Sequence, residues 1–136
     1  MVKSNKKKTI KNKNNIDYVV AIPTYKRYNE ITTKTLPTLK RGKVNKKRIY
    51  VFVANRSEER LYREKMDPDT YHKIVVGKKG LVPQRRYISQ YFPEGTKIVS
   101  MDDDVQNMIK LNKDDSLKKI SNLDTLFKRF FNTLTK

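Results

Sequence analysis

Three consecutive carboxylates directly follow an apolar run. The run covers residues 98–101, and the acids are Asp102, Asp103 and Asp104. Side chains alternate between the two faces of a strand, so Asp102 and Asp104 would point one way and Asp103 the other. Like charges at the end of a buried strand are costly unless a cation compensates them. Two such oxygen ligands suit a divalent cation that also holds phosphate oxygens. The alternative is a solvated acidic turn.

Four apolar, β-branched runs predict the elements that would position these acids. They cover residues 18–22, 49–54, 73–76 and 97–101. Continuous apolar runs, rather than alternating ones, indicate strands buried on both faces. Each gap is long enough for a crossover helix. This rhythm predicts an α/β fold with a mostly parallel, Rossmann-like sheet flanked by helices.

The three gaps carry different helix signals. In the first, Pro37 should break or kink a helix. The second opens at residues 55–59 with a capping residue and acids, and it closes at the turn signal 67–69. The third predicts a helix over residues 81–92, with Leu81, Ile88, Tyr91 and Phe92 along one side.

Composition restricts the possible functions. The chain has 136 residues, enough for one domain, and carries a net charge of +18. A charge of this size favours polyanionic partners such as nucleic acid or nucleotide phosphates. Cysteine is absent and His72 is the only histidine, which excludes disulfides, thiolate zinc sites and multi-histidine sites. No apolar run is long enough to span a membrane, and no signal peptide is recognisable, so we expect a cytoplasmic protein.

Residues 1–15 contain a tract rich in Lys and Asn with little apolar content. Such a segment cannot bury enough surface to offset its ordering entropy, so we expect a disordered basic tail. A solvated tail is the favoured interpretation, and a nucleic-acid-binding arm is the alternative.

Polar residues follow every predicted strand. These segments are residues 23–27, 55–56, 77–80 and 102–104. In parallel sheets, ligands bind beyond the carboxyl ends of the strands, so the four segments should meet at one edge. Hydroxyls, cations, glycines and carboxylates gathered there suit a nucleoside diphosphate on a metal. Ordinary polar loops are the alternative.

Three segments resemble motifs of the GT-A nucleotide-sugar glycosyltransferases, in particular family 2-like members. Residues 19–27 resemble the opening strand, residues 80–88 the Gly-rich turn and Arg-containing helix, and residues 97–105 the metal strand with its Asp-x-Asp motif. Their order and spacing agree over residues 18–105. The likeness is nearest to GT-A-like proteins of large DNA viruses and phages, which would place the protein in the host cytoplasm or the virion.

The resemblance implies a role for individual residues. Those expected to contact the nucleotide are Pro23, Thr24, Tyr25, Arg27, Asn55, Gly80, Arg85 and Asp102. Mn²⁺ or Mg²⁺ would be held by Asp104 with help from Asp102. Asn55 stands where many members have Asp, so the identity of the nucleotide is left open.

The implied function is that of a metal-dependent glycosyltransferase, or of its nucleotide-sugar-binding portion. It would transfer a sugar from a nucleoside diphosphate donor to an acceptor that the sequence does not identify. Nucleic acid is one candidate acceptor, because some of the relatives are proposed to glycosylate modified DNA bases. The alternative function is a basic nucleic-acid-binding protein without enzymatic activity, with tyrosines available for stacking. A metal nuclease would need more carboxylates than this edge offers.

Residues 113–136 predict an amphipathic helical extension after a nucleotide- and metal-binding domain at 16–112. Its apolar stripe is Leu123, Leu126, Phe127, Phe130, Phe131 and Leu134, and Ser121 with Asp124 suggests a capping box. Either this helix packs back on the sheet, or the chain is the front half of a larger domain. The second is favoured, and we therefore expect an incomplete domain. The catalytic base would lie downstream of the metal motif, and Asp114, Asp115 and Asp124 lie in no recognisable base motif.

Overall fold

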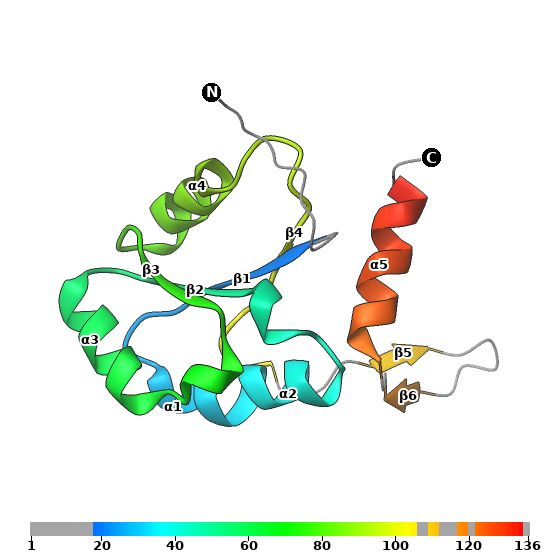
Figure 1. Ribbon diagram of the computed structural model, residues 1–136, viewed down its shortest axis with the longest axis horizontal. Helices are drawn as coiled ribbons and strands as arrows, with labels where there is room; N and C mark the ends of the chain where they lie inside the picture. Colours follow the sequence, from blue (N-terminus) through cyan, green and yellow to red (C-terminus); the bar gives the residue numbers. More distant parts are fainter. Residues whose placement is uncertain (1–17, 106–108, 112–116, 120–121, 135–136) are drawn as a thin grey trace.

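The computed structural model of the chain describes residues 18–105, 109–111, 117–119 and 122–134. Its main feature is a sheet of four parallel strands in the order β3-β2-β1-β4. The strands are β1 (Val19–Pro23), β2 (Ile49–Val53), β3 (Lys73–Val76) and β4 (Ile98–Ser100). Each predicted apolar run forms a strand, and the predicted α/β fold with a parallel sheet is confirmed (Figure 1).

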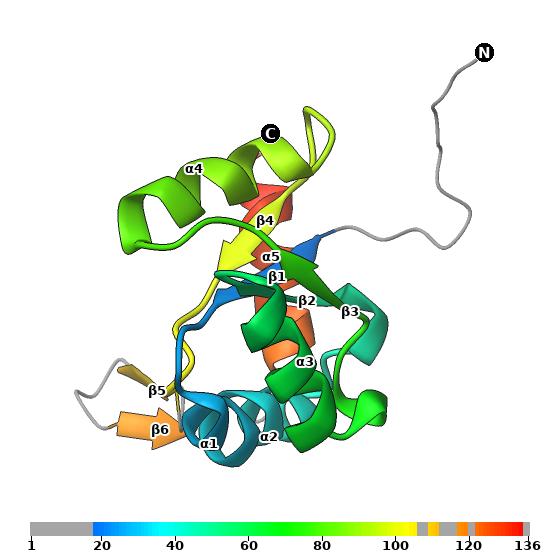
Figure 2. The same cartoon turned by 90° about the vertical axis from the view of Figure 1, so that its left-hand side faces the viewer.

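Helices cover both faces of this sheet, which explains why its strands are apolar throughout. Helix α4 (Leu81–Tyr91) lies on one face, as Figures 1 and 2 show. The other face carries α1 (Tyr28–Glu30), α2 (Leu36–Arg41) and α3 (Arg56–Lys65). Strand β1 lies between β2 and β4, and no part of Val20, Ala21 or Ile22 is exposed.

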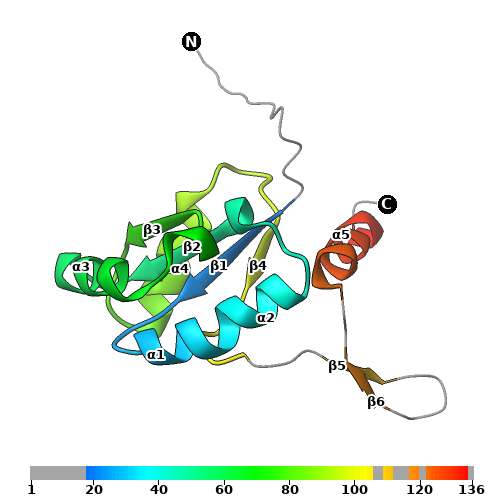
Figure 3. The same cartoon turned by 60° about the horizontal axis from the view of Figure 1, so that its bottom comes forward.

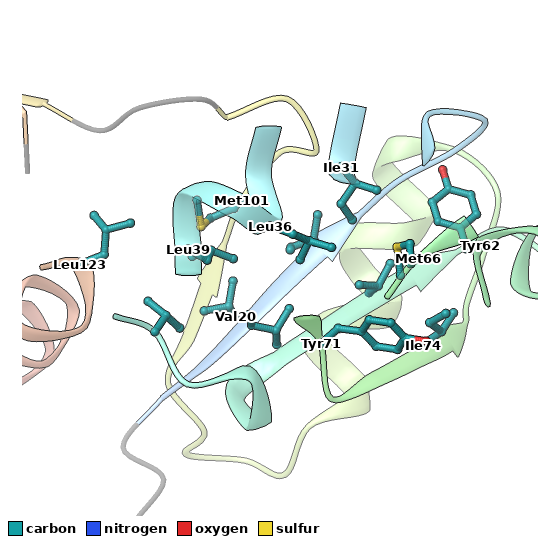
Figure 4. Packing of buried hydrophobic residues seen from close by; sticks show 14 of the residues in the cluster. Val20, Ile31, Leu36, Leu39, Tyr62, Met66, Tyr71, Ile74, Met101 and Leu123 are labelled. Carbon is teal, nitrogen blue, oxygen red and sulfur yellow. The ribbon is translucent and has the colours of Figure 1, made fainter. Parts of the chain in front are cut away.

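The sheet separates two apolar clusters. The larger cluster, drawn in Figure 4, joins Val20 of β1 to Ile31, Leu36 and Leu39 above it. Tyr62, Met66, Tyr71 and Ile74 continue it toward α3 and β3. The smaller cluster contains Val19, Ala21, Phe52, Val75, Ile88 and Phe92. Burial of β1 in both clusters fixes the centre of the sheet.

The first crossover is a helix that continues through Pro37. A π-helical turn (Ile31–Thr35) connects α1 to α2, and the Leu36 N–H donates to the Ile31 carbonyl five residues back. Pro37 then lies in the first turn of α2. Proline has no N–H and its ring clashes with the carbonyl four residues earlier, so a widened turn lets the helix continue. The predicted interruption thus takes the form of a π turn.

The other two crossovers largely agree with the prediction. Asn55 begins α3 as its cap, because its Oδ1 accepts the Glu58 N–H at 2.9 Å. The turn signal at 67–69 corresponds to a 3₁₀ turn (Pro68–Thr70), and a second 3₁₀ turn (Lys46–Arg48) precedes β2. In α4, Ile88 is buried as predicted, but Leu81 is 57% exposed. Leu81, the first residue of α4, lies outside the smaller apolar cluster that contains Ile88.

The remaining elements follow the parallel sheet. Strands β5 (Ile109–Leu111) and β6 (Leu117–Lys119) pair antiparallel and were not predicted. Helix α5 (Leu123–Leu134) lies beside the domain (Figure 3). Leu123 and Phe127 of its apolar stripe are buried in the larger cluster, whereas Phe130 is 57% exposed. The helix therefore packs back on the domain. That the chain is the front half of a larger domain stays a prediction.

Polar contacts hold the start of α5. The Gly42 carbonyl accepts the Leu123 N–H at 2.7 Å, and Asn122 caps the helix by accepting the Thr125 N–H. Ser121, predicted as the cap, lies outside the described residues. Asp124 accepts the Tyr18 hydroxyl at 2.6 Å. The Asp124 carboxylate also forms ion pairs with Arg48 and Lys128. Asp124 therefore serves to attach the helix.

The predicted tail, residues 1–15, also lies outside the described residues. Within the part of the chain that the structure describes, no helix has the length and apolarity needed to cross a bilayer.

The two phenylalanines of α5 provide a matched test of this packing. Phe127 is 7% exposed and its ring lies 5.5 Å from that of Tyr18, whereas Phe130 is 57% exposed. We expect Phe127→Ala to lower the free energy of unfolding by about 3–5 kcal/mol, because it leaves a cavity. Phe130→Ala should cost less than about 1 kcal/mol. Urea unfolding of both variants measures this, and equal losses would show that α5 is not packed as described.

Candidate functional site

The carboxyl ends of the strands surround a cavity of about 370 Å³. Segments that directly follow β1, β2 and β3 line it, together with the acidic turn that follows β4. The lining residues are Pro23, Thr24, Tyr25, Arg27, Ala54, Lys78, Gly80, Leu81, Gln84, Asp102, Asp103 and Asp104. The predicted convergence of polar segments at one sheet edge is confirmed for the ends of β1, β3 and β4. The β2 end contributes only Ala54, and neither residue of its predicted polar segment, 55–56, lines the cavity.

The structure brings most of the predicted site residues together. The predicted residues that line this cavity are Pro23, Thr24, Tyr25, Arg27, Gly80, Asp102 and Asp104. Asn55 is not among the lining residues, because its side chain caps α3. Arg85 lines a second cavity, of about 850 Å³, beside β4 and α5. Asp102 lines both cavities, so it lies between Arg85 and the residues that line the smaller cavity.

Asp103 is the buried member of the acidic turn. It is 7% exposed, whereas Asp102 and Asp104 are exposed. Strand β4 ends at Ser100, so the acids lie in a turn beyond the strand that was expected to carry them. Asp103 is buried and its two neighbours are exposed, but all three acids line the same cavity; the opposite orientation predicted from strand alternation is not observed, because these residues lie in a turn. The burial of Asp103 itself was not predicted.

A helix holds this acidic turn at both ends. Thr35 Oγ1 donates to the Asp102 carbonyl at 2.7 Å and accepts the Val105 N–H at 2.9 Å. Thr38 Oγ1 donates to the Val105 carbonyl at 3.0 Å. The backbone of the turn is therefore positioned by side chains of the π turn and α2, directly after the hydrogen bond from the Met101 N–H to the Ala21 carbonyl of β1.

A closed ring of hydrogen bonds holds Asp103. Thr24 Oγ1 donates to Asp103 Oδ2 at 2.7 Å and lies 2.7 Å from the Tyr62 hydroxyl. Because Thr24 has only one hydroxyl hydrogen, Tyr62 must donate to Thr24. The Tyr62 oxygen in turn accepts a hydrogen bond from the backbone N–H of Arg27 at 2.9 Å. Arg27 Nε lies 3.3 Å from Asp103 Oδ1, which closes the ring.

Arg27 pairs with two of the three acids of the turn. Arg27 also contacts Asp104, with Nη2 3.3 Å from Oδ2. Burial raises the pKa of Asp103, and the Thr24 hydrogen bond and the Arg27 charge partly offset this rise. Burial also raises the pKa of Tyr62. Both groups thus depend on the ring, since an unpaired buried polar group costs free energy.

The mouth of the cavity is basic and aromatic. Tyr25 is 37% exposed, and the ammonium groups of Lys26 and Lys79 lie 5.3 and 5.5 Å from its ring centroid. Gln84 is buried behind this rim, where its Oε1 accepts the Lys78 N–H at 2.9 Å. A Cβ at Gly77 would lie 2.1 Å from that same oxygen, so only glycine fits there.

Tyr62 and Gln84 are the site residues that sequence reasoning missed. Each is a polar residue on the buried face of its helix, four residues from another buried position: Glu58 in α3 and Ile88 in α4. This spacing of four residues could have indicated that Tyr62 and Gln84 face the interior, because residues four apart share a helix face.

The cavity has the donor set for a cation that a ligand helps to hold. Within the described residues there is no group of three or more potential metal ligands. Asp102 and Asp104 nevertheless both line the cavity and are exposed to it. Mg²⁺ commonly binds through one or two carboxylates and completes its shell with phosphates and water. The two acids fit a metal that arrives with a diphosphate.

Comparison with known proteins identifies the family. A family model of TET-associated glycosyltransferases (TAGT) matches residues 18–136. The chain belongs to this family. No curated protein and no solved structure matches it. The glycosyltransferase class expected from the sequence motifs is thereby confirmed. The matched residues include the parallel sheet, strands β5 and β6, and helix α5 of this TAGT domain.

The hydrogen-bond ring predicts a specific cost for losing one hydroxyl. Tyr62→Phe should lower the free energy of unfolding by about 1–3 kcal/mol, because the Arg27 N–H and the Thr24 oxygen lose their partner. Tyr71→Phe is the matched control, since Tyr71 is also buried but is outside the ring. Chemical unfolding of both variants decides the matter; a larger loss for Tyr71→Phe would contradict the ring.

The raised pKa of Asp103 predicts a direction of pH dependence. The folded state binds the Asp103 proton more tightly than the unfolded state, whose pKa is near the ordinary 3.8. The contribution of Asp103 to stability therefore falls as pH rises from that value through the folded pKa. Unfolding of the wild type and Asp103→Asn across this range should show the wild type losing stability relative to the variant. A relative gain would refute the assignment.

Proposed function

We propose that this TAGT domain is a metal-dependent glycosyltransferase, or the nucleotide-sugar-binding portion of one, that uses a nucleoside diphosphate sugar as donor. The observation that carries the proposal is the meeting of carboxylates and cations in one cavity at the carboxyl edge of the sheet. Asp102 and Asp104 line this cavity together with Arg27 and Lys78, and Arg27 Nη2 lies 3.3 Å from Asp104 Oδ2. Such an edge is where parallel α/β sheets bind nucleotides.

The proposed roles follow from charge. Breaking a sugar–diphosphate bond develops negative charge on the leaving diphosphate, and Arg27 and Lys78 are the cations placed to stabilise it. Mn²⁺ or Mg²⁺ at Asp104 and Asp102 would add Lewis-acid stabilisation of the same charge. Tyr25 offers a ring at the mouth for the nucleoside, and Gly80, at a positive φ of 99°, starts α4 beside it.

Two predicted residues receive other roles in this proposal. Asn55 supports the site indirectly, because its side chain caps α3 and α3 carries Tyr62, whose hydroxyl contacts Thr24. Arg85 lies in the adjoining cavity, so it would reach a donor only from beyond Asp102. Asp124 does not fit a catalytic base, because Tyr18 and Arg48 occupy its carboxylate. Asp114 and Asp115 lie outside the described residues, and the base is left unassigned.

We further propose a hydroxyl group on nucleic acid as the acceptor. The net charge of +18 favours a polyanionic partner. Some relatives of the GT-A-like viral and phage proteins that the sequence resembles are proposed to glycosylate modified DNA bases, which agrees with this charge. A basic nucleic-acid-binding protein without enzymatic activity is the alternative, and the donor experiment below separates the two.

The carboxylate–metal proposal predicts a selective loss of donor binding. In titration calorimetry with a panel of nucleoside diphosphate sugars and Mn²⁺, Asp104→Asn should weaken binding by about 10–100-fold, because a charge-assisted contact is lost. Asp69→Asn is the control, since Asp69 is an exposed acid outside the cavity. Equal affinities in the wild type and Asp104→Asn would overturn the metal site. Tight nucleic-acid binding by a wild type that binds no nucleotide with any metal would favour the non-enzymatic alternative.

A further inference from the structure

A groove runs along the outer side of β3. It is distinct from the cavity at the carboxyl ends of the strands, which we call the donor cavity because we propose that it binds the sugar donor. The volume of the groove is about 530 Å³, and β3 is the last strand on that side of the sheet. Helix α3 contributes Arg56 and Arg63, β3 contributes Lys73, and α4 contributes Tyr91. Figure 2 shows β3 and α3 lying near each other on this side of the molecule.

The groove is strongly basic and its cations are accessible. The side chains of Arg56 and Arg63 are 79% and 55% exposed, and Lys73 is also exposed. Glu59 is the only acid among the lining residues. Arg63 donates to it at 2.7 Å, and this hydrogen bond, with the charges of Arg56 and Arg60, lowers the pKa of Glu59. The cations therefore outnumber the acid.

The positive field extends beyond the groove toward the amino ends of the strands. His72 lines the groove, and burial lowers its pKa. The charges of Lys73, Lys47 and Lys46 lower that pKa further. Lys46 also pairs with Asp69, with Nζ 3.2 Å from Oδ1, so its charge is partly neutralised.

The groove and the donor cavity share no lining residue, but their linings come close together along the chain. Arg56 in the groove lies two residues after Ala54, which lines the cavity. Val76 in the groove lies two residues before Lys78, which also lines the cavity. Because β3 runs toward the carboxyl edge, a ligand lying along the groove would reach the cavity mouth.

We propose that this groove binds the phosphate backbone of a nucleic-acid strand and leads it to the donor cavity. Spaced cations beside an aromatic side chain are the combination that single strands bind, with Tyr91 as the aromatic residue here. A membrane surface fits less well, because interfacial binding pairs cations with exposed apolar groups. The exposed large apolar side chains of the described residues are Tyr25, Leu81, Val82 and Phe130, and none lines the groove. The role as an acceptor track rests on the proposed function.

Two triple variants with the same charge change test this surface in the full chain. The groove variant combines Arg56→Gln, Arg63→Gln and Lys73→Gln; the control combines Lys34→Gln, Lys40→Gln and Arg86→Gln, none of which lines the groove. Fluorescence anisotropy with labelled single-stranded and duplex oligonucleotides, over a salt series, measures the affinity. We expect the groove variant to bind at least about tenfold more weakly, with a salt slope smaller by about 2–3, because each lost phosphate contact removes released counterions. The control should change less than about threefold.

Glu59→Gln provides a test that loss of folding cannot imitate. Removing the one acid of the groove should strengthen oligonucleotide binding by about two- to tenfold. Equal weakening in the two triple variants, or weaker binding by Glu59→Gln, would overturn the proposal. Tighter binding to phosphatidylserine vesicles than to oligonucleotides would also overturn it, in favour of a membrane. These measurements need neither donor nor metal, and the groove variant should keep its Mn²⁺-dependent nucleotide affinity, so failure here is distinguishable from failure of the proposed function.

Discussion

The complete burial of strand β1 is the constraint on which the rest of this structure depends. Val20, Ala21 and Ile22 are fully buried, and β1 pairs in parallel with strands on both sides. A strand enclosed in this way requires helices on both faces, and parallel pairing requires each connection to return along the sheet. All four strands consequently end at one edge. That edge collects Thr24, Arg27 and the acidic turn, and the hydroxyls of Thr35 and Thr38 fix the backbone of that turn.

Much of this arrangement could be predicted from the sequence, because burial on both faces produces continuous apolar runs. The same is true of α3, whose cap at Asn55 is a local signal, and of the family motifs at the sheet edge. The orientation of the acidic turn depended on contacts distant in sequence. Thr24 meets Asp103 across 79 positions, and no local pattern reports that pairing. Tyr62 was missed for a related reason: its ring looks like a core residue, and only its hydroxyl contacts the site.

The separation of Asn55 and Arg85 from the cavity shows the limit of motif reasoning. A motif predicts which residues lie near a strand end, but the helix that follows decides which way each one faces. Asn55 lies close to the edge and uses its side chain for the cap. Arg85 lies one turn into α4, where it contacts the cavity beside β4. The basic groove has no motif at all, since its cations come from α3 and β3 and meet only in the folded chain.

The π turn at Ile31–Thr35 has a consequence for how this fold tolerates change in length. Compared with an α-helix, the turn contains one additional residue. Loss of one residue there would rotate the part of the helix after the turn by about 100° around the helix axis, relative to the part before it. Thr35 and Thr38, which hold both ends of the acidic turn, would then no longer face it together. The number of residues between the first strand and Pro37 is therefore constrained by these contacts to the backbone of the acidic turn, although more than sixty positions separate Thr35 from Asp102 along the chain.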